Sequence, residues 1–211
     1  MQSRGGRDGV RTSVPQALLL GLYLRDAGGL RPPAEDDRPE LPPLTPSIAP
    51  LRPGGEPLAG IGAASRQWAR WWRGAWPGEA AALTGILPPS FPAWHGCPEL
   101  QGIAHLLLDD ALEWAVGARA RAEGVLRMFP TALAETNLLA DLESRLGRSI
   151  RPFSLPVVLL PVRGKDAWRI GGTDVVSLAL RGDRDAYLDW LRRRLLELAA
   201  ERHPRPSPEE R

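Results

Sequence analysis

The sequence predicts an α+β protein in which a helical N-terminal region precedes a small C-terminal antiparallel β-meander that is packed by a C-terminal helix. Apolar residues first recur with the helical period of 3.6, most regularly over residues 98–129. Short runs rich in β-branched residues follow over residues 153–180, and the helical period returns at 183–201. Because three strands alone cannot bury an apolar face, we expect one α+β domain over residues 14–201 with a shared core.

The composition predicts a bacterial, cytoplasmic protein. Lys165 is the only lysine among 27 basic residues, which is typical of a GC-rich bacterial genome and is therefore not evidence for phosphate binding. The single cysteine, Cys97, rules out an internal disulfide framework and fits a reducing compartment. No run reaches the roughly 18 to 20 apolar residues of a membrane span, so we expect no membrane association.

The N-terminal part begins with residues 1–13, which are polar and contain glycine, and these we expect to be disordered. Residues 14–26 read as a short helix. The arginines before this helix resemble the start of a signal peptide, but Pro15 and the early charges Arg25 and Asp26 interrupt it. No small-residue cleavage site follows, so export is disfavoured.

A proline-rich segment covers residues 31–57, with nine prolines between positions 32 and 57. Proline forbids helix continuation, so the segment is extended. It can be a free linker, a ligand for an aromatic groove, or a strap lying across its own protein. Four large apolar side chains recur along it, which a solvated linker rarely carries and which favours the strap: Leu41, Leu44, Ile48 and Leu51.

The helical region continues over residues 58–147. A tryptophan-rich helix at 65–76 precedes a short helix at 78–87 and an ordered corner at 88–98. Pro98 can begin the longest helix, because proline is tolerated at a first helical position. A further helix over 131–146 ends at Gly147, a residue type that commonly caps helix C-termini.

The β-meander and its helix cover residues 150–201. Strands are expected at 153–162, 167–170 and 173–180, with glycine turns between them. Pro156 and Pro161 favour a first strand that lies at an edge or carries a bulge. The final helix spans 183–201, and residues 202–211 form a disordered tail.

Four tryptophans form the strongest candidate interaction surface. Helical geometry places them on one face, with the arginines of the same helix on the opposite face: Trp68, Trp71, Trp72 and Trp76 against Arg66, Arg70 and Arg73. A single-strand nucleic-acid binder needs cations beside its rings, so we expect no nucleic-acid partner. The pattern favours a helix docked on a core. Four indole N–H groups are hard to satisfy inside a small domain, which leaves part of this face for a protein partner or self-association.

An alternative is a small hydrolase-like enzyme, with a Cys/His or a metal-assisted mechanism, whose site lies around His95, Cys97 and His105. A thiol just before a helix start at Pro98 has part of the environment that lowers a thiol pKa. No known cysteine-enzyme signature surrounds it, however, and a lone cysteine is most often a small buried hydrophobe.

A metal site is the weakest candidate. His105, Asp109 and Glu113 share one face of the long helix at i, i+4 and i+8. The apolar residues of this helix lie on its opposite face, so these three side chains are expected on a solvated surface. A zinc site would also need ligands from another element, and the sequence indicates none. We expect no metal and no cofactor.

Nucleophile-elbow, phosphate-loop and dinucleotide motifs are missing from the sequence. The leading hypothesis is therefore a non-enzymatic interaction or accessory protein that binds through the tryptophan-rich helix, together with the proline-rich segment.

Overall fold

A computed structural model of the chain describes residues 9–33, 39–51, 59–76, 85–87, 91–147 and 153–201. Its helices and a four-stranded mixed sheet confirm the α+β class. The expectations for residues 1–8, for most of the short helix at 78–87 and for the tail at 202–211 lie outside the described residues.

The sheet differs from the predicted meander. Its strands run in the order β1-β2-β4-β3, and they are β1 (Gly9–Ser13), β2 (Ser154–Leu160), β3 (Ala167–Ile170) and β4 (Thr173–Ser177). Only β3 and β4 form an antiparallel hairpin, whereas β2 pairs in parallel with both β1 and β4. The prediction of an antiparallel meander is therefore wrong, because β2 does not pair with the strand that follows it.

Strand β1 corrects a second expectation, since the polar composition of residues 9–13 predicts disorder. It pairs from Gly9 opposite Ser154 to Ser13 opposite Val158. Arg11 of β1 also bonds Ser154 across 143 positions of sequence. Pairing with β2 orders this polar strand, and the sequence of residues 9–13 alone does not indicate that partner.

Strand β2 lies inside the sheet, although its prolines favoured an edge. N–H directions alternate along a strand, and Phe153 directs its carbonyl to Gly9 of β1. Pro156 therefore faces the β4 side, where pairing begins only at Val157. Its missing N–H costs no ladder hydrogen bond, so an interior strand tolerates it.

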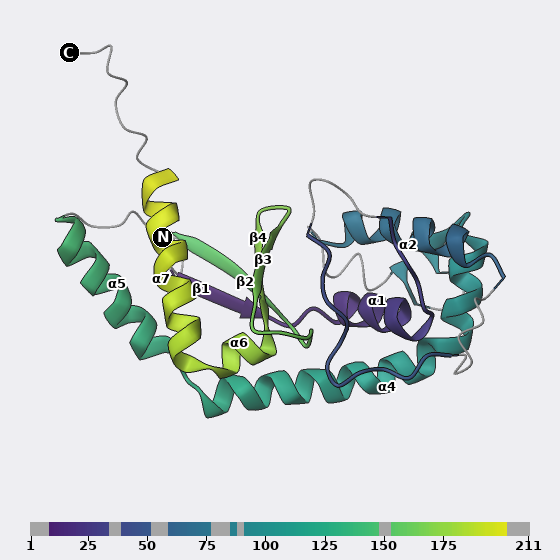
Figure 1. The fold of residues 1–211 in the computed structure, drawn as a ribbon, viewed down its shortest axis with the longest axis horizontal. Coiled ribbons are helices and arrows are strands. Elements are labelled where there is room, and N and C mark those ends of the chain that lie inside the picture. The colour runs from purple at the N-terminus through teal and green to yellow at the C-terminus, as the bar shows by residue number, and fades with distance from the viewer. Residues whose placement is uncertain are drawn as a thin grey trace, which may run out of the picture.

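The helices agree more closely with expectation (Figure 1). They are α1 (Gln16–Ala27), α2 (Ile61–Ala75), the 3₁₀ turn η1 (Pro92–Trp94), α4 (Pro98–Met128), α5 (Ala132–Leu146), α6 (Leu178–Gly182) and α7 (Arg184–Glu201). Gly147 caps α5 with a left-handed φ of 63°, as predicted. The sequence predicts strand for residues 178–180, but these residues begin α6, because the Ser177 hydroxyl accepts the N–H of Leu180 as an N-cap.

Both faces of the sheet are covered. Val158 and Leu160 of β2 face a core shared with α1, α2 and α4, whereas Val157 and Leu159 face a core shared with α5 and α7. Figure 1 shows the sheet between α1 with α2 on one side and α5 with α7 on the other, with α4 running along the molecule. The sheet therefore joins the two halves of the fold.

None of the helices in the described part of the chain has both the length and the apolar character to cross a bilayer.

Candidate functional site

The four tryptophans of α2 lie in the core or at its margin. Trp68, Trp71 and Trp72 are 3%, 8% and 9% exposed, and Trp76 is half-buried. The rings of Trp68 and Trp72 stack with centroids 4.8 Å apart, and the Trp71 ring is tilted against Trp72 at 6.0 Å. A docked core helix, the interpretation that the segregated arginines favoured, is therefore confirmed for the first three tryptophans.

The indole N–H groups are satisfied unevenly. Trp68 donates to the carbonyl of Gly21 on α1 over 2.8 Å. The Nε1 atoms of Trp76 and Trp94 are buried and have no hydrogen-bond partner among the residues that the structure describes. A buried indole N–H without an acceptor carries a desolvation cost. The indole N–H groups of Trp76 and Trp94 are therefore less well hydrogen-bonded than that of Trp68.

Residues 39–51 of the proline-rich segment lie across the end of α1, and we call them the strap. Leu41 and Leu44 are buried. Thr45 donates its N–H to the carbonyl of Pro161 over 2.7 Å, and Leu51 donates to Ala27 over 2.8 Å. Extended chain of this kind has no internal hydrogen bonds, so these contacts with other segments hold it in place.

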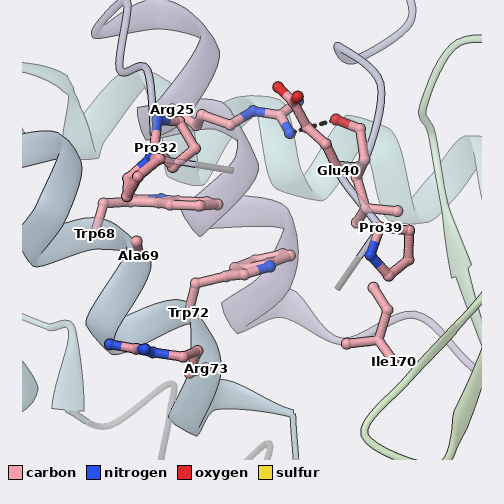
Figure 2. Close-up of a pocket in the computed structure, with 11 residues that line it drawn as sticks. Arg25, Pro32, Pro39, Glu40, Trp68, Ala69, Trp72, Arg73 and Ile170 are labelled. Carbon is pink, nitrogen blue, oxygen red and sulfur yellow. Dashed lines mark hydrogen bonds between the residues drawn. The ribbon is translucent and has the colours of Figure 1, made fainter. Parts of the chain in front are cut away.

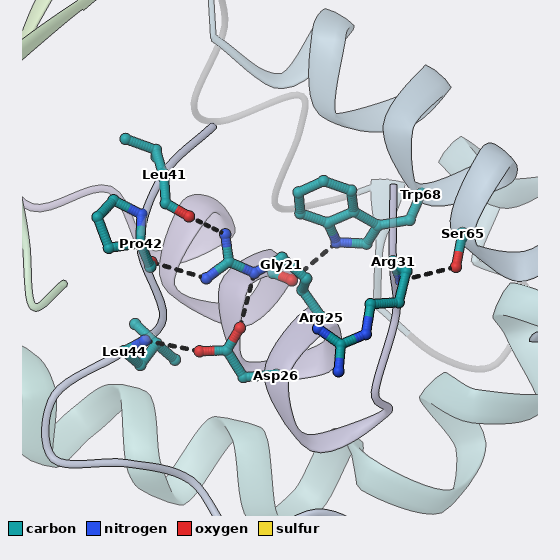
Figure 3. A network of polar contacts seen from close by, with 9 residues as sticks. All are labelled: Gly21, Arg25, Asp26, Arg31, Leu41, Pro42, Leu44, Ser65 and Trp68. Carbon is teal, nitrogen blue, oxygen red and sulfur yellow. Dashed lines mark hydrogen bonds and ion pairs between the residues drawn. The ribbon is translucent and has the colours of Figure 1, made fainter. Parts of the chain in front are cut away.

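A charged pair on α1 fixes the strap (Figure 3). The guanidinium of Arg25 donates to the carbonyls of Leu41 and Pro42 over 2.7 and 2.8 Å, and its Nε donates to Asp26 over 2.6 Å. The second oxygen of Asp26 accepts the N–H of Leu44 over 2.6 Å. Since these groups are largely buried, the pair replaces water as the partner of three strap backbone groups.

A pocket of about 190 Å³ lies between the strap and α2 (Figure 2), and we call it the strap pocket. Figure 2 shows the Trp72 ring pointing across it toward Pro39 and Ile170. The end of α1 with the prolines and strap that follow it meets α2 and the end of β3 here. The lining residues are Arg25, Pro32, Pro33, Pro39, Glu40, Leu41, Trp68, Ala69, Trp72, Arg73 and Ile170.

The lining of this pocket is mostly apolar. Its walls are indole rings, prolines and aliphatic side chains, and Glu40 is the one carboxylate among the described lining residues. Arg25 is already engaged with Asp26 and the strap. The exposed side chains of Glu40 and Arg73 place charges of opposite sign at the rim. The described lining offers no hydroxyl, thiol or imidazole as a nucleophile or base.

The candidate enzyme residues do not form a site with this pocket. Cys97 is buried at 8% exposure just before α4, as a structural cysteine would be, while His95 and His105 are exposed. The His105 ring lies edge-on to Phe91, with centroids 4.7 Å apart. None of the three lines the strap pocket.

The metal candidates remain on the surface. His105, Asp109 and Glu113 are exposed along α4. Within the described ranges, no group of three or more histidine, cysteine, aspartate or glutamate side chains is placed to hold a metal ion.

Sequence reasoning missed several residues that build the strap pocket. In the sequence, Arg25 and Asp26 indicate only that export is disfavoured, yet in the structure they fix the strap. The signal that points to them is a charged pair at the end of an apolar helix directly before a proline-rich segment. Ile170 offers no such signal, because its place depends on how the β3–β4 hairpin meets the strap.

No protein-family model, curated protein or solved structure matches this chain.

Proposed function

We propose that this chain is a non-enzymatic interaction protein whose strap pocket receives one apolar side chain of a partner protein. The observation that carries this proposal is the lining of the pocket: the indoles of Trp68 and Trp72 on one side, and Pro39 and Ile170 on the other. Aromatic and aliphatic pockets of this kind accept the anchoring side chains that dominate binding energy at protein interfaces.

The size of the pocket favours a side chain over a cofactor or substrate. Its volume of about 190 Å³ lies below the roughly 300 to 1,000 Å³ of sites that enclose drug-sized ligands. The exposed Glu40 and Arg73 supply a polar rim around an apolar centre, which is the usual anatomy of a protein interface.

The charges around the pocket disfavour a nucleic-acid partner. Arg25 is paired with Asp26, and the other two charged residues of the described lining, Arg73 and Glu40, have opposite signs. Binding to phosphates requires cations in excess. No observation favours the alternative enzyme around His95, Cys97 and His105.

The test uses capped amino-acid amides as probes, because each presents one side chain. N-acetyl-leucinamide, N-acetyl-phenylalaninamide and, as the side-chain-free reference, N-acetyl-glycinamide are titrated into the protein. The indole N–H resonances of Trp68 and Trp72 are followed by NMR. We expect the leucine or phenylalanine amide to shift both resonances with a Kd on the order of 1 mM, and the glycine amide to leave them unchanged.

Two variants at position 69 and one control localise the binding. Ala69 lines the pocket, so Ala69→Leu fills it, whereas Ala69→Ser changes the same position and leaves the space open. Ala120→Leu adds the same atoms to an exposed position of α4. Loss of at least about ten-fold in affinity, or about 1.4 kcal/mol, is expected for Ala69→Leu alone. Equal affinity of a folded Ala69→Leu protein and the wild type contradicts the proposal.

A further inference from the structure

A second pocket, of about 170 Å³, is lined by residues of β3, β4 and α7. Its lining combines two tryptophans with three arginines and two carboxylates: Trp168, Arg169, Asp174, Trp190, Arg193 and Arg194, with Glu197 at its side. None of these residues takes part in the strap pocket. We call it the arginine pocket.

The arginine pocket contains a buried ion pair. Both carboxylate oxygens of Asp174 lie 3.1 Å from Nε of Arg194, and the two side chains are 5% and 6% exposed. Burial raises the pKa of the Asp174 carboxyl even though the Arg194 hydrogen bond opposes the rise. Such a pair contributes little net stability compared with apolar packing, and titratable groups with perturbed pKa values gather at functional sites.

The charges of the lining favour an anion. Arg169, Arg193 and Arg194 outnumber Asp174 and Glu197, so three positive charges face two negative ones. Arg193 is exposed and makes no hydrogen bond or ion pair with any residue that the structure describes. Its guanidinium is therefore available to a carboxylate or phosphate group.

The two tryptophans add an aromatic surface. Trp168 and Trp190 are both half-buried and both line the arginine pocket. The Trp190 ring contacts Tyr187, with centroids 5.5 Å apart. Indole faces stack on planar rings and on guanidinium groups, so this surface suits a flat group beside the arginines.

We propose that the arginine pocket binds a small anion in which one planar ring carries a carboxylate or a phosphate group. The ring contacts Trp168 and Trp190, and the anionic group contacts Arg193. The volume of about 170 Å³ limits the ligand to about a single ring, because larger ligands occupy roughly 300 Å³ or more. This site is independent of the strap pocket and of the partner proposed for it.

Four probes separate the contributions of ring and charge. Benzoate and phenyl phosphate carry both, benzyl alcohol carries the ring alone, and acetate carries the charge alone. The indole N–H resonances of Trp168 and Trp190 are assigned with Trp→Phe variants and followed by NMR during each titration. We expect benzoate or phenyl phosphate to bind at least about ten-fold more tightly than benzyl alcohol and acetate. The tighter of the first two identifies the anionic group.

Two matched glutamine variants then test the proposed contact between the anionic group and Arg193. Arg193→Gln should weaken the binding of the better probe about ten-fold. Arg184→Gln removes the same charge from an exposed position of α7 outside the pocket, and it should leave the affinity unchanged within about two-fold. Equal binding of benzyl alcohol and benzoate overturns the proposal. So do equal effects of the two variants, or shifts that fail to include Trp168 and Trp190.

Discussion

The Nε1–H group of Trp68 donates a hydrogen bond to the main-chain carbonyl of Gly21 over 2.8 Å. This bond joins α2 to α1 at a position without a side chain. A Cβ atom on Gly21 would lie 2.5 Å from Cζ3 of Trp71. Gly21 therefore accepts the hydrogen bond of the Trp68 indole, and its lack of a side chain leaves space for the Trp71 ring.

Gly21→Ala should destabilise the protein by about 1 to 3 kcal/mol, because the added methyl group overlaps a packed indole ring. Gly102→Ala is the matched control on an exposed part of α4, since its added methyl group would meet no other side chain of the described residues within 4 Å. That change should stabilise the protein by about 0.5 to 1 kcal/mol. Urea unfolding of both variants measures the difference, and a Gly21→Ala protein as stable as wild type would show that the cluster is loosely packed.

Arg25→Met should release the strap. The substitution removes the donors to Leu41 and Pro42 and leaves Asp26 without its ion-pair partner. We expect a loss of about 2 to 4 kcal/mol and faster amide hydrogen exchange at Leu44, whose N–H bonds Asp26. The control is Arg66→Met, which removes the same charge from an exposed position of α2. Unchanged exchange at Leu44 in Arg25→Met would refute the role given to this arginine.

Arg181→Leu should loosen the corner between α4 and α5. The buried guanidinium of Arg181 donates to the carbonyl of Phe129 and the hydroxyl of Thr131, each over 3.0 Å, and lies over the Tyr187 ring. Its loss leaves two acceptors unpaired, so we expect a destabilisation of about 2 to 4 kcal/mol in urea unfolding. Arg119→Leu, at an exposed position of α4, should change the stability by less than about 0.5 kcal/mol. Similar losses in the two variants would contradict the assignment.

Acid should weaken the link between α2 and α4. A hydrogen bond from Gln67 to Glu99, over 2.5 Å, lowers the pKa of the Glu99 carboxyl below its ordinary 4.5. The folded state therefore binds the proton less readily than the unfolded state, and the stability from this bond is present above pH 4.5 and lost as the pH falls through the lowered pKa.

The measurement compares wild type with Glu99→Gln by urea unfolding from about pH 6 to about pH 3. The wild type should lose more stability than Glu99→Gln over this range. Gln67→Leu removes the hydrogen-bond donor and should reduce the difference. An identical pH dependence of wild type and Glu99→Gln would contradict the prediction.

The helices were predictable from sequence because their determinants are local. The 3.6-residue period of α4, Pro98 at its start and Gly147 after α5 all lie within the elements that they define. The pairing of the sheet was not predictable in this way, because β1 and β2 are separated by most of the chain. One signal was present: residues 157–160 form a continuous apolar run, which is typical of a parallel strand buried on both faces.

The candidate site was predictable in part. The spacing of Trp68, Trp71 and Trp72 and the segregation of the arginines indicated a core helix, and the buried Leu41 and Leu44 agree with a strap. The strap pocket itself could not be predicted, because it exists only where Ile170 of β3 meets the strap and α2. The arginine pocket depends likewise on Asp174 and Arg194, which lie 20 positions apart on different elements.

The most direct test of the proposed function is an intermolecular nuclear Overhauser measurement between N-acetyl-leucinamide and the protein. The methyl protons of the probe should show contacts with the indole protons of Trp68 and Trp72 and with the methyl protons of Ile170, which together line the strap pocket. Contacts that involve none of these three residues, at a probe concentration that saturates binding, would contradict the assignment of the strap pocket as the interaction site.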